Sequence, residues 1–391
     1  MKCLDYILSP MGQSEFFSGV WDSRAIHIEG KKEKFRDLFG WASLNRMLNA
    51  FPAPHPSLKL FKHGKPVSGK DSIEIIRQTQ KGATLILEDA DRYDPGLSRF
   101  LDTFADEVGE RLRFNLYLSY PDEQGYRLHY DTQDFFILQI SGFKRWKVYG
   151  STMDSPLFFQ KQHSTKPPPE ETLYLDCLLG PGDVLYCPRG HWHEAVAEKE
   201  PSMHLTLGMF VANGIDFLSW MVDELREQEL CRRNFPILIG EQRADTSIGA
   251  NADLRRRIAE MRTQVNQFLA NPDALADFYR QRTAKQSNRN PFHFPFHLES
   301  FDDAFGPDAE FRRLPHATHL RTTRDSVELA FGGRLVRFPL KAAGAVARIL
   351  EAELFTLRDL NGGASELTER ECRRIAQVLA QEGLVAPVAG R

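Results

Sequence analysis

Closely spaced short strands between residues 112 and 212 constrain the fold of this chain more than any other feature. Six stretches there are rich in β-branched and aromatic residues, and Pro, Gly or Ser-Gly turns separate them: RFNLYLSY, FFILQI, KRWKVYG, ETLYLDCLL, DVLYCP and MHLTLGMFV. Short strands at this spacing are typical of an antiparallel sandwich or barrel. We therefore predict a mainly β core over residues 106–212.

The rest of the chain divides around this core. A length of 391 residues is too great for one compact core, so we expect two or three domains. Residues 1–105 mix short helices with short strands such as 84–87, and we predict that they pack on the β core. Residues 213–300 are predicted to be a helical region with a linker, and residues 301–391 a separate module.

An apolar stripe marks the helical region. Its members recur at spacings of four, three, four and three residues: Leu254, Ile258, Met261, Val265 and Phe268. These spacings gather apolar side chains on one face of a helix. Such a face docks against the same chain or against a second copy, and we predict a homodimer.

The C-terminal module resembles a winged helix. Two strand-like stretches flank Gly332-Gly333 as a hairpin, a helix follows, and Thr368 with Glu371 forms a capping box ahead of a last long helix. That helix alternates acids and bases and lacks the basic face that phosphate contacts need, so nucleic acid is an unlikely partner and protein docking or a structural role is favoured. Residues 287–301 contain two prolines and are predicted to be a linker or an ordered strap.

Composition excludes several classes of protein. The formal net charge of -3 gives no overall attraction to nucleic acid or anionic membrane. The first residues lack the apolar core of a signal peptide, and no later stretch is apolar over the length of a membrane span, so we expect no membrane association and a cytoplasmic location. Five scattered cysteines without a C-x-x-C pair predict neither disulfides nor a zinc knuckle, and each is expected to be a small buried apolar residue.

Three side chains suggest a metal site. His129 and Asp131 stand one residue apart, where i and i+2 of a strand point to the same face. His193 begins a strand about sixty residues later, and strands distant in sequence can line the same interior of a small barrel. Two imidazoles and one carboxylate on one side of a metal leave positions open, as in the facial triad of non-haem Fe(II) oxygenases. The competing interpretation of the H-x-D pair alone is a hydrogen-bonded pair at a strand edge.

Three other residues compete for roles near this site. His191 is the rival of His193 as a ligand and is otherwise expected at the rim of the pocket. Cys187 is a conceivable soft ligand, although iron in oxygenases prefers N and O donors and core packing is favoured. His204 is expected to be either a core histidine with its hydrogen bonds satisfied or a residue that orients the metal ligands.

The wider pattern is more specific than any of these residues alone. His129 and Asp131 precede an apolar strand, a cation follows fifteen residues after the histidine, and residues 182–193 read G-D-x-x-Y-x-P-x-G-x-x-H. From Phe114 to His204 the chain resembles the JmjC-type cupin oxygenases of the ribosomal-oxygenase group. The resemblance implies a double-stranded β-helix, Fe(II) held by His129, Asp131 and His193, and 2-oxoglutarate as co-substrate. It also implies a helical dimerisation region and a C-terminal winged helix.

The same resemblance assigns residues to the co-substrate. It implies that Lys144 pairs with the far carboxylate of 2-oxoglutarate, and that Asn115 and Tyr117 line the co-substrate pocket. A buried dicarboxylate needs such a paired charge. The alternative is a solvated Lys144 with Arg145 in the pocket, because neighbours in a strand point to opposite faces. Gly208 stands where some members carry a hydroxyl residue.

The function implied is that of an Fe(II)- and 2-oxoglutarate-dependent dioxygenase that hydroxylates a side chain of a protein or peptide. A ribosomal protein is the implied substrate, modified on arginine or histidine. Two alternatives stay open: the same chemistry on a natural-product peptide or small molecule, and a non-catalytic JmjC regulator. The residues do not distinguish hydroxylation from demethylation.

Overall fold

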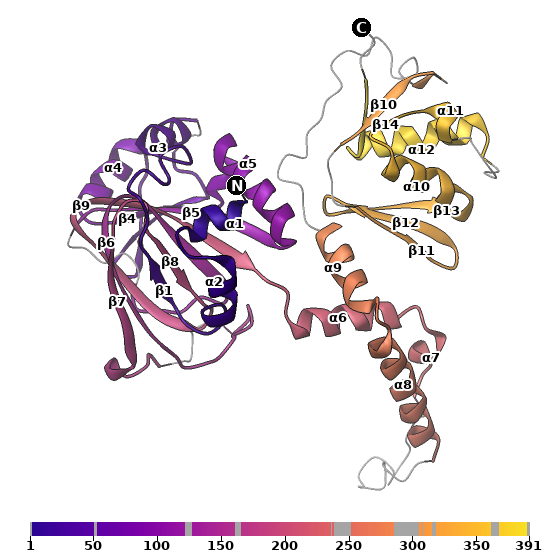
Figure 1. The fold of residues 1–391 in the computed structure, drawn as a ribbon, viewed down its shortest axis with the longest axis horizontal. Helices are drawn as coiled ribbons and strands as arrows, with labels where there is room; N and C mark the ends of the chain where they lie inside the picture. The colour runs from indigo at the N-terminus through magenta and orange to yellow at the C-terminus, as the bar shows by residue number, and fades with distance from the viewer. Residues whose placement is uncertain are drawn as a thin grey trace. The chain divides into compact units, whose positions relative to one another are not determined.

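The computed structural model describes residues 2–50, 53–121, 127–160, 166–235, 237, 252–284, 305–306, 308–314, 318–360 and 367–388. The chain divides into two units, Met1–Val211 and Ala212–Arg391, which Figure 1 shows in indigo to pink and in pink to yellow. The predicted linker at 287–301 lies outside the described residues.

A nine-stranded sheet forms the body of the N-terminal unit. Its order is β1-β8-β6-β9-β5-β4-β2-β3, with β7 paired to β6. The strands are β1 (Ile26–Ile28), β2 (Leu58–Lys62), β3 (Lys65–Val67), β4 (Thr84–Leu87), β5 (Arg111–Ser119), β6 (Asp134–Ser151), β7 (Leu173–Leu179), β8 (Val184–Cys187) and β9 (His191–Phe210). Their pairing is antiparallel, and Figure 1 shows the sheet curved around an interior. The predicted mainly β core is confirmed, and residues 1–105 add β1 to β4 to the same sheet.

Two strands, β6 and β9, are longer than the sequence predicts. The Ser141-Gly142 step was expected to separate two strands, but β6 continues through it with shifts of register against β9. Gly142 has φ +67, and a Cβ there would lie 2.2 Å from the carbonyl oxygen of Pro201. A glycine at a bulge lets the strand bend without ending. Lys144 therefore lies within β6 and does not begin a separate strand.

The two faces of the sheet have different roles. One face packs under the helices of this unit, and its buried members on β5 alternate along the strand: Leu112, Phe114 and Leu116. The other face of β5 carries Tyr117 and Ser119 into the interior of the sheet. Period-two alternation thus separates a hydrophobic core from an interior that can hold polar groups.

Helices cover the outer face. They are α1 (Cys3–Leu8), α2 (Gln13–Gly19), α3 (Trp41–Leu48), α4 (Ser72–Gln80) and α5 (Pro95–Val108). In α5, Asp94 caps the first turn by accepting hydrogen bonds from the backbone N–H groups of Gly96 and Leu97 at 2.9 and 3.0 Å. The helix ends at Gly109, whose φ is +71. Its apolar face is fully buried, and each large apolar side chain buried in this way contributes about 1.5–3 kcal/mol.

The C-terminal unit begins with helices. Asn213 starts α6 (Gly214–Leu225) with a capping box, and α7 (Glu229–Arg232), α8 (Ala252–Ala270) and α9 (Ala274–Ala284) follow. The predicted stripe lies on α8. Phe268 packs against Trp220 of α6 at 5.3 Å between ring centroids, whereas Ile258 is 51% exposed. Among the described residues, Ile258 is the exposed member of the stripe, and the other four members are half-buried.

Two three-stranded sheets and three helices complete this unit. β11 (Thr318–Thr322), β12 (Ser326–Phe331) and β13 (Arg334–Pro339) form one sheet, and β10 (Glu310–Arg313) pairs with β14 (Leu354–Thr356) and β15 (Val385–Pro387). The helices are α10 (Ala343–Glu351), α11 (Leu357–Leu360) and α12 (Glu369–Gln381). The predicted hairpin is confirmed: Gly332 and Gly333 both have positive φ between paired Phe331 and Arg334. The capping box of Thr368 and Glu371 at α12 is confirmed too.

Two smaller expectations can be compared with the structure. All five cysteines are free, and four are buried as predicted, whereas Cys231 is half-buried. Among the described residues, no helix has the length and apolar character needed to cross a membrane.

Candidate metal centre and its cavity

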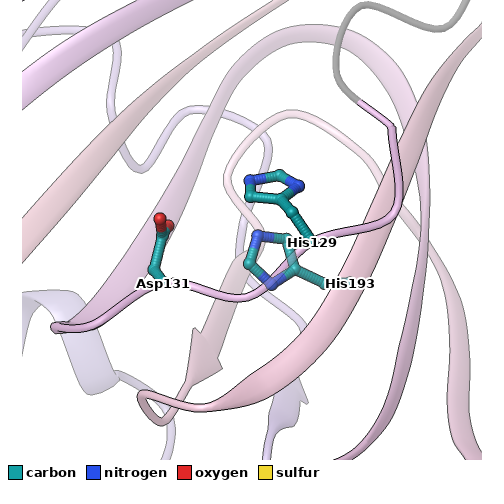
Figure 2. Close-up of side chains that lie close together, drawn as sticks. All are labelled: His129, Asp131 and His193. Atoms are coloured by element: carbon teal, nitrogen blue, oxygen red, sulfur yellow. The ribbon is translucent and has the colours of Figure 1, made fainter. Parts of the chain in front are cut away.

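His129, Asp131 and His193 come together in the N-terminal unit. One ligand atom from each side chain lies within 4.8 Å of the others, and the two imidazole rings are 4.3 Å apart between centroids. Figure 2 shows the three side chains directed into the same space. Two imidazoles and one carboxylate are a donor set that suits a divalent transition metal.

The backbone explains how residues far apart in sequence meet here. His129 forms an isolated antiparallel bridge with His193, and each backbone N–H donates to the carbonyl oxygen of the other residue at 3.1 and 2.6 Å. The backbone N–H of Gly190 donates to the carbonyl oxygen of Asp131 at 2.9 Å. His129 and Asp131 are therefore held in a segment before β6, and not in a regular strand as the sequence predicts.

The imidazole tautomers suit metal binding. Nδ1 of His129 lies 2.8 Å from the carbonyl oxygen of Arg127, and Nδ1 of His193 lies 3.1 Å from that of His191. A carbonyl oxygen accepts only, so each Nδ1 must carry the proton, and each Nε2 then presents its lone pair. Such hydrogen bonds orient metal-binding histidines in proteins generally.

Arg127 also ties this segment to the β2–β3 turn. Its Nε donates to the carbonyl oxygen of His63 at 3.1 Å. Gly64, in the same turn, has φ +72, and a Cβ there would lie 2.7 Å from Cγ of Arg127. The residue whose carbonyl orients His129 is thus itself held by the N-terminal part of the sheet.

The electrostatics keep His193 ready to bind a cation. Burial, and then the neighbouring His129, lower the pKa of His193 to about 4, although Asp131 opposes this. The imidazole is therefore neutral at physiological pH, as a ligand must be. Burial of an uncharged donor beside a carboxylate fits a site that takes up positive charge from an ion.

A cavity of about 50 Å³ extends from these residues into the sheet. Its lining residues come from β4, β5, β6 and β9 and from the segment before β6: Thr84, Tyr117, His129, Asp131, Phe135, Ile137, Lys144, Trp146, His193, Ala195, His204 and Thr206. Asp131 is the one acid among them. The candidate metal donors and a buried cation thus share a single cavity.

Lys144 is that cation. It is 5% exposed, and its Nζ donates to Oγ of Ser119 at 3.1 Å, which in turn lies 3.0 Å from Oγ1 of Thr84. Burial lowers the pKa of Lys144 to about 7. No carboxylate pairs with it among the described residues. A buried amine with a hydroxyl partner and no counter-charge fits an anionic ligand.

The remaining predicted residues differ in their placement. Tyr117 lines the cavity, whereas Asn115 is not among its lining residues and accepts a hydrogen bond from the backbone N–H of Asp89 at 3.1 Å. Arg145 is on the opposite face from Lys144, near Asp176 and Glu198. The structure therefore favours Lys144 over Arg145 as the cation of the cavity.

The competing residues also have clear places. Nδ1 of His191 lies 2.6 Å from the hydroxyl of Tyr174, so this imidazole is engaged away from the cavity. Cys187 is fully buried in a hydrophobic cluster, and burial raises the pKa of its thiol. Gly208 does not line the cavity, but Thr206 on the same strand does. The hydroxyls of Thr206, Ser119 and Thr84 were missed, because period-two alternation alone does not say which interior positions meet.

Comparison with known proteins identifies this part of the chain. Residues 89–217 match the model of the JmjC domain family. Over this range the chain is similar to the JmjC domain family. All three candidate ligands and Lys144 lie within the matched residues.

Ribosomal oxygenases are among the proteins that are similar to this chain in sequence. Over 312 residues it is 25% identical to Ribosomal oxygenase 1 of Rattus norvegicus, covering 71% of this chain and 50% of the relative. Over 304 residues it is 26% identical to the bifunctional lysine-specific demethylase and histidyl-hydroxylase NO66 of Drosophila mojavensis, covering 73% and 34%. The chain thus spans about a third of the length of the Drosophila mojavensis relative and half of the length of the Rattus norvegicus relative.

The chain shares its fold with solved structures. The Escherichia coli ribosomal oxygenase YcfD in complex with cobalt and 2-oxoglutarate matches with a TM-score of 0.56 and 17% identity, over 97% of this chain and 99% of that one. Another structure of E. coli YcfD matches with a TM-score of 0.57 and 19% identity. At this identity the likeness supports the fold.

Proposed function

We propose that this chain is an Fe(II)- and 2-oxoglutarate-dependent dioxygenase that hydroxylates a side chain of a protein or peptide. The observation that carries the proposal is one cavity with two chemically distinct ends. His129, Asp131 and His193 offer a facial set of metal donors at one end, and Lys144 offers an unpaired buried cation at the other. A keto diacid fits both ends, because it can chelate a metal and present a second carboxylate.

Different residues would bind the metal and the far carboxylate of the co-substrate. The Nε2 atoms of His129 and His193 and a carboxylate oxygen of Asp131 would hold the metal and leave positions open for co-substrate and dioxygen. Lys144, with Ser119 beside it, would hold the far carboxylate. Together the metal, 2-oxoglutarate and dioxygen supply the oxidising power for hydroxylation, with succinate and CO₂ as products.

The walls of the cavity exclude water. Phe135, Ile137 and Trp146 are 5% exposed or less and line the space between the two ends. Tyr117 lines the same space, and we propose it as a co-substrate contact. Asn115 lies two residues before Tyr117 on β5, and we propose that it supports the co-substrate pocket without lining it. A dry, shaped cavity positions the reactants and protects a reactive site from side reactions.

The substrate class is proposed from the relatives. Two of them are named ribosomal oxygenase and histidyl-hydroxylase, so a ribosomal protein, modified on histidine or arginine, is the substrate that we propose. The test is incubation of the iron-loaded protein with 2-oxoglutarate and ribosomal proteins from its own organism, followed by peptide mass spectrometry. We expect one peptide to gain the mass of one oxygen atom.

The controls separate the alternatives. His129→Ala should produce no oxidised peptide. Loss of a methyl group from a lysine would instead indicate demethylation. Succinate formation stimulated only by small molecules or non-ribosomal peptides would redirect the substrate class, and absence of succinate with every substrate despite bound iron would favour a non-catalytic regulator.

We also propose that the helical region mediates a homodimer and that residues 301–391 form a winged-helix module that docks protein. The exposed side chain of Ile258 on α8 and the absence of any fully buried residue among the described positions of this helix support the first proposal. Light scattering should give twice the monomer mass for the wild type and the monomer mass for Ile258→Asp. A wild-type monomer would contradict it.

A further inference from the structure

His204 is a buried histidine whose hydrogen bonding is incomplete. It lies on β9, is 1% exposed, and lines the cavity. Its Nδ1 is fully buried and has no hydrogen-bond partner among the described residues. Leaving such an atom unpaired costs about 1–3 kcal/mol, so the position calls for an explanation.

The ring is held firmly by its neighbours. It stacks on Tyr117 with ring centroids 4.9 Å apart and an interplanar angle of 4°. Trp146 meets it edge-on at 5.6 Å. Two aromatic contacts fix the plane of the imidazole within the cavity wall without giving Nδ1 a hydrogen-bond partner.

The charged neighbour of His204 is Lys144. Burial, and then the positive charge of Lys144, hold the pKa of His204 well below its usual range. The titratable groups that face it are Lys144 from β6 and Tyr117 from β5, while Gln139 of β6 and Thr84 of β4 are uncharged. The acid of the cavity, Asp131, belongs to the metal end. Lys144 and His204 thus share the inner end of the cavity, which is the end away from Asp131, and no acid lies between them among the lining residues.

We propose that His204 is a second positively charged donor for the far carboxylate of the co-substrate, and that it gains its proton when the dicarboxylate binds. A carboxylate between Lys144 and His204 would stabilise the charged form of both. The step is a simple protonation: one proton moves from solvent to the imidazole, and no bond of the co-substrate changes.

The inference rests on the proposed function and explains why the inner end carries two basic groups. In the empty cavity, neutral His204 spares the fold a second buried charge. In the filled cavity, Lys144 and His204 would oppose the charge of the carboxylate. A keto acid without the second carboxylate would leave His204 neutral, so the pair would select for dicarboxylates.

The test counts protons by isothermal titration calorimetry. Mn(II)-loaded protein is titrated with 2-oxoglutarate at pH 6 in buffers that differ in ionisation enthalpy, because Lys144, whose pKa is about 7, already carries its proton there. We expect the wild type to take up close to one proton from solvent. His204→Gln should take up none and bind 2-oxoglutarate roughly ten- to a hundredfold more weakly. Pyruvate should bind both proteins equally, without proton uptake.

The controls keep failure of the two proposals apart. His319→Gln, a matched substitution in the C-terminal unit, should behave as the wild type. Wild-type protein that binds 2-oxoglutarate in a Lys144-dependent manner without taking up a proton overturns the role of His204 and leaves the proposed function standing. No binding of Mn(II) or 2-oxoglutarate overturns both. If His204→Gln does not fold, the proton count of the wild type and its absence with pyruvate still decide.

Discussion

Lys144→Met should make the ligand-free protein more stable. The folded state holds this ammonium group away from water and without a carboxylate among the described residues, which lowers its pKa from 10.5 to about 7. Since one pH unit corresponds to about 1.4 kcal/mol, the buried charge destabilises the fold by up to about 5 kcal/mol below pH 7. Methionine has a similar length and no charge. Loss of the hydrogen bond to Ser119 removes about 1 kcal/mol, so we expect a net gain of about 2–4 kcal/mol.

The pH dependence gives the prediction its sign. Because the folded pKa of Lys144 lies below the unfolded value, the unfolded chain binds more protons between about pH 7 and pH 10.5. Wild-type stability should therefore rise with pH across this window, by up to about 1.4 kcal/mol per unit from this group. The advantage of Lys144→Met should be greatest below pH 7 and should vanish near pH 10.5.

Urea unfolding at a series of pH values measures both effects. Four of the five tryptophans belong to the N-terminal unit, so intrinsic fluorescence reports mainly on the unit that contains the cavity: Trp21, Trp41, Trp146 and Trp192. Lys147→Met removes a lysine from the same strand but outside the cavity and controls for loss of charge. A Lys144→Met protein that is no more stable than the wild type at pH 6, or that keeps the wild-type slope, would refute the reasoning. The same variant should lose 2-oxoglutarate binding.

Other substitutions test the metal site and the fold. His129→Ala should weaken Mn(II) binding by more than about 100-fold in calorimetry, and wild-type affinity would contradict its role as a ligand. Gly142→Ala should destabilise the protein by about 2–4 kcal/mol in urea, because the new Cβ would lie 2.2 Å from the carbonyl oxygen of Pro201; Gly150→Ala, with its nearest neighbour at 3.7 Å, should have little effect. Asp94→Ala should cost about 1–2 kcal/mol through loss of the α5 cap, and Asp94→Asn much less; equal losses would argue against capping.

Local patterns in the sequence predict much of the fold. Alternation and turn residues identify the β core, and Gly332-Gly333 and the Thr368–Glu371 box identify a hairpin and a helix start, because these features depend on neighbours in the chain. The continuity of β6 and β9 could not be predicted. Whether Ser141-Gly142 ends a strand or bends it depends on β9, and this partner is distant in sequence.

The same division applies to the candidate site. The sequence predicts that His129, Asp131 and His193 converge, and the structure brings them together, although the regular strand expected around His129 and Asp131 is replaced by a segment with one isolated bridge. The hydroxyl groups around Lys144 and the incomplete hydrogen bonding of His204 emerge only from the register of four strands. Patterns among neighbouring residues do not predict how these four strands are aligned with one another.

The contact between Arg127 and the β2–β3 turn has a practical consequence for protein engineering. Residues 89–217 match the JmjC domain model, yet the arginine whose carbonyl orients the first histidine is anchored on His63, well upstream of that range. A fragment trimmed to the matched range would lose this anchor together with β2 and β3. Expression boundaries should therefore start ahead of Leu58.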